Sequence, residues 1–161
     1  MDVTRPIVDI DGTAYSATPQ RDLEHLIVDL YASPPLAVVT GLAGGVMEVF
    51  GTTTPQFAED KWKVETEHWH IHSRVSVVHA VRFERGPGGP GGPGTEMLCI
   101  HLLDEGHEPL LRFFLTGRYD AEGHPIPARF ARYEDLKSRY GGHDGHDGHD
   151  VVGCLNGVFQ R

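Results

Sequence analysis

The alternation of hydrophobic and polar positions predicts a helix, a series of strands and a second helix. Residues 19–31 carry an apolar stripe at i, i+3, i+4, i+7 and i+8, which is one face of an amphipathic helix. Thr18-Pro19 supplies an N-cap and a first-turn proline, and Ser33-Pro34-Pro35 ends the helix. Residues 127–140 repeat the helical spacing and end at Gly141-Gly142.

The segment between the helices reads mostly as short strands. Two β-rich runs flank a glycine-rich turn and predict a hairpin, and four more runs follow it. The expected strands are residues 36–40, 46–50, 69–72, 75–84, 96–103 and 110–116. Polar residues 51–66 read as a connection with a short helical turn, and Pro-Gly repeats at 86–94 read as an exposed mobile loop. The predicted class is α+β: an antiparallel meander sheet of about six or more strands with helices at the N- and C-terminal ends.

The chain divides into three parts on composition. Residues 1–17 read as an irregular arm, 18–140 as a single α+β domain, and 141–161 as a His/Asp/Gly-rich tail. The His-Asp-Gly repeat at 143–150 is too polar to fold alone, so we expect a solvated, mobile tail. Loose binding of divalent metal by these side chains is the alternative.

Charge and composition narrow the class of partner. A net charge of −9 argues against a protein that tracks nucleic-acid phosphates, and only three lysines are present, so a polybasic membrane patch is not expected. The sequence has no apolar run near the ~20 residues of a membrane span. Cys99 and Cys154 form no paired motif. These features favour a cytoplasmic protein without membrane insertion or nucleic-acid partners.

Three alternating histidines form the first candidate for chemistry. In an extended strand, His68, His70 and His72 share one face. Imidazole is a common metal ligand, but the three positions span ~13 Å of strand, so one strand supplies at most two ligands comfortably. His70 and His72 are therefore the candidate metal ligands. A solvent-facing strand whose polar face happens to be histidine remains the alternative.

A second candidate comes from hairpin register. If the Pro-Gly loop closes so that paired residue numbers sum to 180, His79 lies opposite His101. If the paired residue numbers of the next hairpin sum to 213, His101 lies beside Arg112. The resulting row of His79, His101 and Arg112 in an apolar face suits a large apolar anion with a coordinating metal or carboxylates. The alternative is that each of the three is a core or edge residue whose hydrogen bonds are satisfied within the protein. A one-residue slip in the register of either hairpin would also move one of the partners to the other face of the sheet.

Several motifs in this order resemble the haem-utilisation family, which includes HemS-type hemin-degrading or carrier proteins and ChuX/HutX-type carriers. The motifs are His70-Ile71-His72, the strand to Phe83, residues 97–106, Leu111-Arg112-Phe113-Phe114, Gly117-Arg118 and a final helix with Arg132-Tyr133-Glu134-Asp135-Leu136. The glycine-rich segment 44–51 is also similar to one in the carriers. The family's Phe-Gly-Lys-Arg run is not intact, the final helix lacks its Trp, and residues 20–140 make one repeat where HemS-type proteins have two.

The resemblance implies a split-barrel-like antiparallel sheet with flanking helices and a haem pocket. It also implies a carrier rather than an enzyme, and a homodimer, as in the single-repeat ChuX-type carriers. Together with the residues, it predicts haem held by an imidazole of His70, His72, His79 or His101, with Arg112 or Arg118 at the propionates. Two alternatives stay open: a haem-degrading enzyme, or a fold that has lost haem and binds another apolar anionic small molecule.

Overall fold

The structure is a computed structural model that describes residues 5–8, 14–18, 20–42, 45–51, 53–88 and 94–141. Two helices and ten strands lie in these ranges. The helices are α1 (Gln20–Tyr31) and α2 (Pro127–Tyr140), and a 3-10 turn, η1, covers Val75–Val77. The strands are β1 (Arg5–Val8), β2 (Ala14–Thr18), β3 (Leu36–Leu42), β4 (Gly45–Phe50), β5 (Gln56–Ala58), β6 (Lys61–Glu65), β7 (His70–Arg74), β8 (Ala80–Pro87), β9 (Glu96–Leu103) and β10 (Pro109–Leu115). The predicted α+β class is confirmed.

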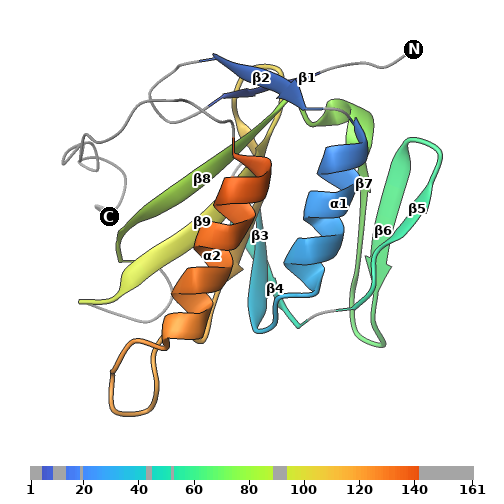
Figure 1. The fold of residues 1–161 in the computed structure, drawn as a ribbon. Helices are drawn as coiled ribbons and strands as arrows, with labels where there is room; N and C mark the ends of the chain where they lie inside the picture. Colours follow the sequence, from blue (N-terminus) through green and yellow to red (C-terminus); the bar gives the residue numbers. More distant parts are fainter. Residues whose placement is uncertain are drawn as a thin grey trace.

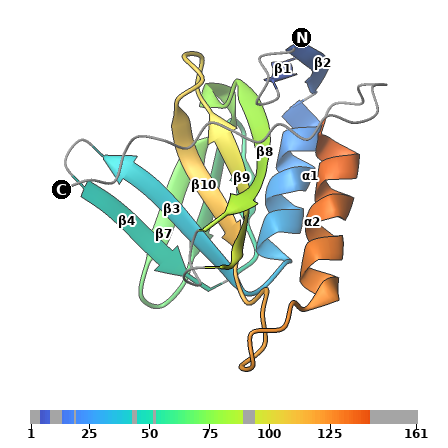
Figure 2. The same ribbon diagram turned by 90° about the vertical axis from the view of Figure 1, so that its left-hand side faces the viewer.

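The strands form three antiparallel sheets. The largest has the order β4-β3-β10-β9-β8, the second has the order β5-β6-β7, and β1 pairs with β2. Helices α1 and α2 lie side by side on one face of the five-stranded sheet, and the three-stranded sheet stands beside α1 (Figure 1). Figure 2 shows both helices on the same side of the five strands. The expected single meander is thus divided, although β8, β9 and β10 do follow one another as neighbours.

The hydrophobic core lies between the helices and one face of the five-stranded sheet. The stripe of α1 is buried there, with Leu26, Ile27 and Leu30 at most 1% exposed, as its spacing predicts. Alternate strand residues such as Ile100 and Phe113 meet them from the sheet. Trp62 of the smaller sheet packs on Tyr31 of α1 with ring centroids 5.9 Å apart, so both sheets share this core.

Two segments differ from the sequence-based expectation. Residues 51–66, expected to be a connection, contain β5 and β6, because Trp62 and Val64 alternate with Lys61 and Lys63 and bury one face of a short hairpin. Residues 1–17, expected to be irregular, contribute β1 and most of β2 to a hairpin that contacts β8 and α1. The tail predicted for 141–161 lies outside the described residues from Gly142 onward, as does loop 89–93.

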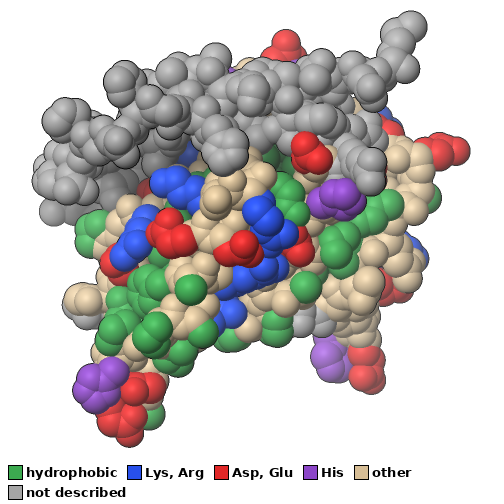
Figure 3. Space-filling model, viewed as in Figure 1, with side chains coloured by type: hydrophobic (Ala, Val, Ile, Leu, Met, Phe, Trp, Pro, Cys, Tyr) green, Lys and Arg blue, Asp and Glu red, His purple; other side chains and the backbone are tan. Residues whose placement is uncertain are grey.

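The outer side of the helix layer is a mixed-charge surface (Figure 3). Arg139 of α2 is 2.7 Å from the Asp29 carboxylate of α1 and 2.7 Å from that of Asp135, so basic and acidic side chains neutralise one another across the two helices. Within the described residues, neither helix is long and apolar enough to cross a membrane.

Candidate functional site

The face of the five-stranded sheet that points away from the helices carries a row of polar residues. We call it the outer face; it includes Arg82, Glu84, Cys99, His101, Leu103, Arg112, Phe114, Ala37, Val39, Glu48 and Phe50. His101 on the central strand β9 pairs with Arg112 of β10, as the second predicted register requires. Its partner on the other side is Arg82 of β8. Three basic or imidazole side chains therefore lie in line across neighbouring strands.

The prediction that His79 lies opposite His101 is wrong. Paired residues of β8 and β9 sum to 183, because Gly86 and Pro87 extend β8 and Gly88 donates to the Thr95 carbonyl at 2.8 Å. Pro87 is tolerated there because β8 is an edge strand. His79 lies just before β8, where its backbone N–H donates to the Leu103 carbonyl at 2.8 Å. Arg82 thus occupies the place predicted for His79.

His101 is held in one orientation by a carboxylate. Its side chain is buried, and its Nε2 lies 2.6 Å from Oε2 of Glu84. This hydrogen bond lowers the pKa of Glu84, and the charges of His101, Arg82 and Arg112 lower it further, while burial acts in the opposite direction. Glu84 is therefore an anionic acceptor at neutral pH, and Nε2 of His101 carries the donated hydrogen. The other ring nitrogen, Nδ1, is left for a further interaction.

The polar row has unused hydrogen-bonding capacity. Among the described residues, Nδ1 of His101 and Nε of Arg82 are buried without a hydrogen-bond partner. Buried polar atoms are nearly always paired in native proteins, so such atoms identify places where a ligand can bind. Around them, Ala37, Val39, Cys99 and Leu103 are buried but lie outside the main core cluster. Toward β4 the same face opens, and Phe50 is 59% exposed.

His70 and His72 lie in a different place, at a cleft between the two larger sheets. We call this the inter-sheet cleft; it has a volume of about 270 Å³ and is lined by Val38, Thr40, Val49, His70, Ile71, His72, Ser73, Leu110 and Leu111. The two imidazole rings are in edge-to-face contact, with centroids 4.9 Å apart. His68 precedes β7 in a turn, where its N–H donates to Thr66, so it does not share the strand with them. Within the described residues, no group of three or more His, Cys, Asp or Glu side chains could hold a metal ion.

Arg118 is a buried residue of the loop between β10 and α2. Its side chain donates to the Leu115 carbonyl at 3.2 Å, and burial lowers its pKa. The register places it beyond the Leu115–Leu36 end of the sheet, whereas the His101 row crosses the middle. The structure therefore brings Arg112, but not Arg118, to His101.

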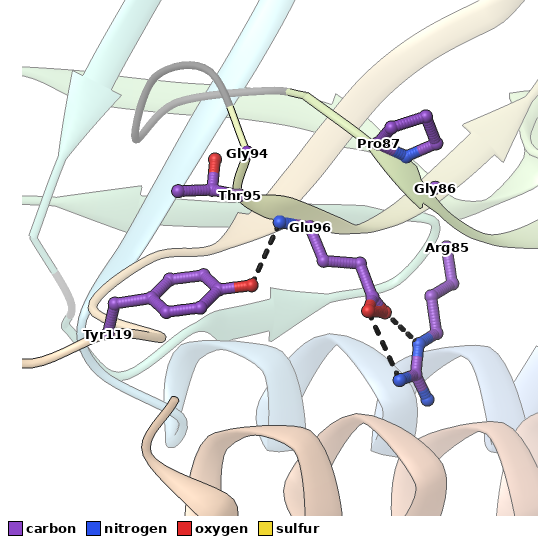
Figure 4. A pocket seen from close by; sticks show the side chains of 7 residues that line it. All are labelled: Arg85, Gly86, Pro87, Gly94, Thr95, Glu96 and Tyr119. Carbon is purple, nitrogen blue, oxygen red and sulfur yellow. Dashed lines mark hydrogen bonds and ion pairs between the residues drawn. The ribbon is translucent and has the colours of Figure 1, made fainter. Parts of the chain in front are cut away.

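A groove of about 800 Å³ lies at the loop end of the β8–β9 hairpin (Figure 4). Its charged groups bind one another: Arg85 forms two hydrogen bonds with the Glu96 carboxylate and one, of 3.0 Å, with Glu134. The Tyr119 hydroxyl accepts the Glu96 N–H at 2.9 Å (Figure 4). These contacts hold α2 and its preceding loop to the hairpin, which is a structural role.

Arg82 and Glu84 are the functional candidates that the sequence analysis missed. Both alternate with buried Val81 and Phe83, so the period-2 pattern was a usable signal that they share one face. The register of the Pro-Gly hairpin decides which β9 residue they meet, and loop length alone did not fix it.

The comparisons with known proteins point to one family. A protein-family model with the description "-like:-like" matches residues 24–139, which is more than half of the chain. The fold is similar to the haem-binding protein ChuX, with a TM-score of 0.61 at 10% identity over 75% of this chain and 74% of ChuX. The chain belongs to the haem-utilisation family. The family resemblance in the sequence is thereby confirmed.

Two larger relatives in the haem-utilisation family have a similar fold. The holo form of PhuS, a haem-binding protein from Pseudomonas aeruginosa, matches with a TM-score of 0.56 at 14% identity, over 81% of this chain and 34% of PhuS. ChuS, an E. coli haem oxygenase, matches with a TM-score of 0.54 at 11% identity, over 75% of this chain and 35% of ChuS. The chain thus spans about a third of each, and at these identities the similarity concerns the fold. No curated protein matches the sequence.

Proposed function

We propose that this protein binds haem on the outer face of its five-stranded sheet, with His101 as axial ligand. The observation that carries the proposal is the buried His101 ring, bonded to Glu84 through Nε2 and without a partner at Nδ1. A metal-ligating histidine nearly always donates its other ring N–H to a carboxylate or carbonyl, which fixes the ring and raises its basicity. Glu84 stands in that position.

The neighbouring residues fit the rest of the haem molecule. Arg82 and Arg112 flank His101 on adjacent strands, where their guanidinium groups can pair bidentately with propionates. Val39, Cys99 and Leu103 are buried beside the polar row, so the surroundings of His101 on this face are apolar, as a macrocycle would require. Haem would supply an iron centre whose properties depend on the axial imidazole and its hydrogen bonding. His70 and His72, also predicted as ligands, lie in the inter-sheet cleft and form an alternative binding place.

The role we propose is that of a carrier. The solved structures of similar fold include a haem-binding protein, ChuX, and a haem oxygenase, ChuS. This chain spans about three quarters of ChuX but only about a third of ChuS. A carrier holds haem without altering it, so hemin bound to the protein should keep its absorbance spectrum when ascorbate and oxygen are added. Conversion to biliverdin under these conditions would assign the enzyme function instead.

A hemin titration of the purified full chain tests the site. We expect a saturable Soret shift with one hemin per chain, and a His101→Ala variant should lose the shift or weaken binding at least tenfold. Arg112→Ala should weaken binding without changing the position of the Soret band, because the arginine would contact the propionates and not the iron.

Two variants serve as controls. His107→Ala removes an exposed histidine of the β9–β10 turn and should leave the titration unchanged. The double variant His70→Ala/His72→Ala should also leave the titration unchanged. If this variant lost the Soret shift while His101→Ala kept it, the haem site would be the inter-sheet cleft. Absence of any Soret shift in the unmodified protein would refute haem binding.

A second candidate follows from Arg82 and His101 together. The unpaired Nε–H of Arg82 can also donate to the carboxylate of a small molecule that contains no iron, while Nδ1 of His101, on the directly paired residue, accepts from an O–H or N–H of the same molecule. Under this alternative hemin produces no Soret shift, while a carboxylate ligand raises the melting temperature of the unmodified protein and not that of Arg82→Ala.

A further inference from the structure

The inter-sheet cleft has features of a ligand site that are independent of His101. It is formed where the helix-facing side of β3, β4 and β10 meets the edge strand β7 of the smaller sheet. Val39 points to the outer face beside Arg112, while its neighbours Val38 and Thr40 line the cleft. The two places therefore lie on opposite sides of the same strand.

The composition of the cleft is that of a site for a small amphipathic molecule. Its apolar surface comes from Val38, Val49, Ile71, Leu110 and Leu111. The polar groups are the imidazoles of His70 and His72 and the Ser73 hydroxyl, from β7, and the Thr40 hydroxyl of β3, which donates to the Leu110 carbonyl at 3.2 Å. A few polar groups set into an apolar wall are typical of small-molecule sites, and a volume of about 270 Å³ is just below their usual range, which suits a small ligand.

The charges around the cleft favour an anion. Across the β6–β7 pairing, Lys63 lies opposite His72 and Lys61 lies opposite Arg74, on the same face as the imidazoles. Glu65, opposite His70, is the acidic residue of this pairing, and Lys63 neutralises it at 3.2 Å. In a chain of net charge −9, two of the three lysines thus stand beside the histidine pair.

We propose that the inter-sheet cleft binds a small carboxylate with an apolar body, at a site separate from the haem-binding outer face. The apolar part would lie against Val49 and Leu111, and the carboxylate would accept hydrogen bonds from the His70 and His72 imidazoles within the field of Lys61 and Arg74. The residues of the cleft differ from Arg82, Glu84, His101 and Arg112. Carboxylate binding in the cleft can therefore be tested independently of haem binding on the outer face.

The test uses 4-phenylbutyrate as the probe and its uncharged amide, 4-phenylbutanamide, as the matched ligand. Amide shifts in the NMR spectrum of the full chain should saturate with 4-phenylbutyrate and should concentrate at Thr40, Ile71, Ser73 and Leu111. The uncharged amide should bind about tenfold more weakly, since it lacks a charge-assisted hydrogen bond. Equal binding of acid and amide would overturn the assignment of an anion.

The variants separate this site from the outer face. His70→Ala/His72→Ala should weaken 4-phenylbutyrate binding about tenfold, since it removes both imidazole donors. His68→Ala, which removes the exposed histidine just before β7, should leave binding unchanged. Both variants change exposed side chains, and their circular dichroism should match that of the unmodified protein. Shifts centred on His101 and Arg112, or loss of 4-phenylbutyrate binding when hemin is added, would show that no separate site exists.

Discussion

The hydrogen bond between His101 and Glu84 couples the stability of the sheet to the orientation of the imidazole. Glu84 accepts a hydrogen bond from His101 at 2.6 Å and is half-buried on β8, two residues from Arg82, which pairs directly with His101. The carboxylate balances the charges of Arg82 and Arg112, which a largely apolar face could not solvate. Removing the charge of Glu84 therefore changes stability as well as the orientation of the imidazole.

A Glu84→Gln substitution tests the contribution of the Glu84 charge to stability. Because the pKa of Glu84 is lowered from 4.5 in the folded state, its charge contributes stability that is present above pH 4.5 and is lost as the pH falls through the lowered value. At pH 7 we expect the variant to lose on the order of 2 kcal/mol of unfolding free energy. The difference should shrink toward pH 3 in urea titrations. Glu105→Gln, on the exposed turn, is the control and should match the unmodified protein at both pH values.

Sequence reasoning predicted the residue types of the site but only part of its arrangement. His101 beside Arg112 followed from the short Asp104–Pro109 connection, whose length constrains the register. Arg82 took the place of His79 because the strand continued through Gly86 and Pro87, residues that composition assigns to a loop. No spacing rule brings His70 and His72 to Thr40 and Leu111, since that contact depends on how two sheets pack.

At the scale of elements, hydrogen bonds from α2 join the end of β10 to the turn that follows α1. Arg129, in the first turn of α2, donates to the carbonyls of Ser33, Pro34 and Pro35 at 2.6–3.3 Å and to that of Thr116 at 3.1 Å. Burial lowers the pKa of Arg129. Gly117 adjoins this junction with φ +62°, and a Cβ there would lie 2.5 Å from Cγ of Pro35. Both helices and the central sheet thus meet at one closely packed point.

A Gly117→Ala substitution tests that junction. The added methyl group meets Pro35 and the backbone must keep a positive φ, so we expect a loss of about 2–3 kcal/mol of unfolding free energy. Gly123→Ala is the matched control, because Gly123 also has a positive φ, +85°, but a Cβ there meets nothing within 4 Å. It should lose only about 1 kcal/mol. Equal losses in urea unfolding would mean that the contact with Pro35 has no cost.

The elements themselves were more predictable than their pairing. Helix α2 and strand β9 begin and end where their sequence patterns predict, because each has an uninterrupted period and a glycine or proline boundary. Strands β5 and β6 were missed because they are short and one face is lysine-rich. A strand of three residues gives too few alternations to separate it from a loop.

At the scale of the molecule, the five-stranded sheet has two edge strands within the part of the chain that the structure describes. Strands β4 and β8 are the edges of the five-stranded sheet, and its outer face opens at β4, where Phe50 is 59% exposed. PhuS and ChuS are each about three times as long as the part of them that this chain matches. We infer that a second copy of this chain covers the open side, as the resemblance to single-repeat carriers implies.

Light scattering coupled to size-exclusion chromatography tests the dimer. For a chain of 17.8 kDa we expect a mass of 35.6 kDa, twice that value, at micromolar concentration. Phe50→Ser should shift the mass toward 17.8 kDa, because it removes an exposed aromatic side chain from the edge strand, where an interface would bury it. Val28→Ser removes another exposed apolar side chain, on α1, and should leave the mass unchanged, since the helix surface is not at the sheet edge. A mass of 17.8 kDa for the unmodified protein, with or without hemin, would contradict the dimer and would require one chain to enclose its ligand alone.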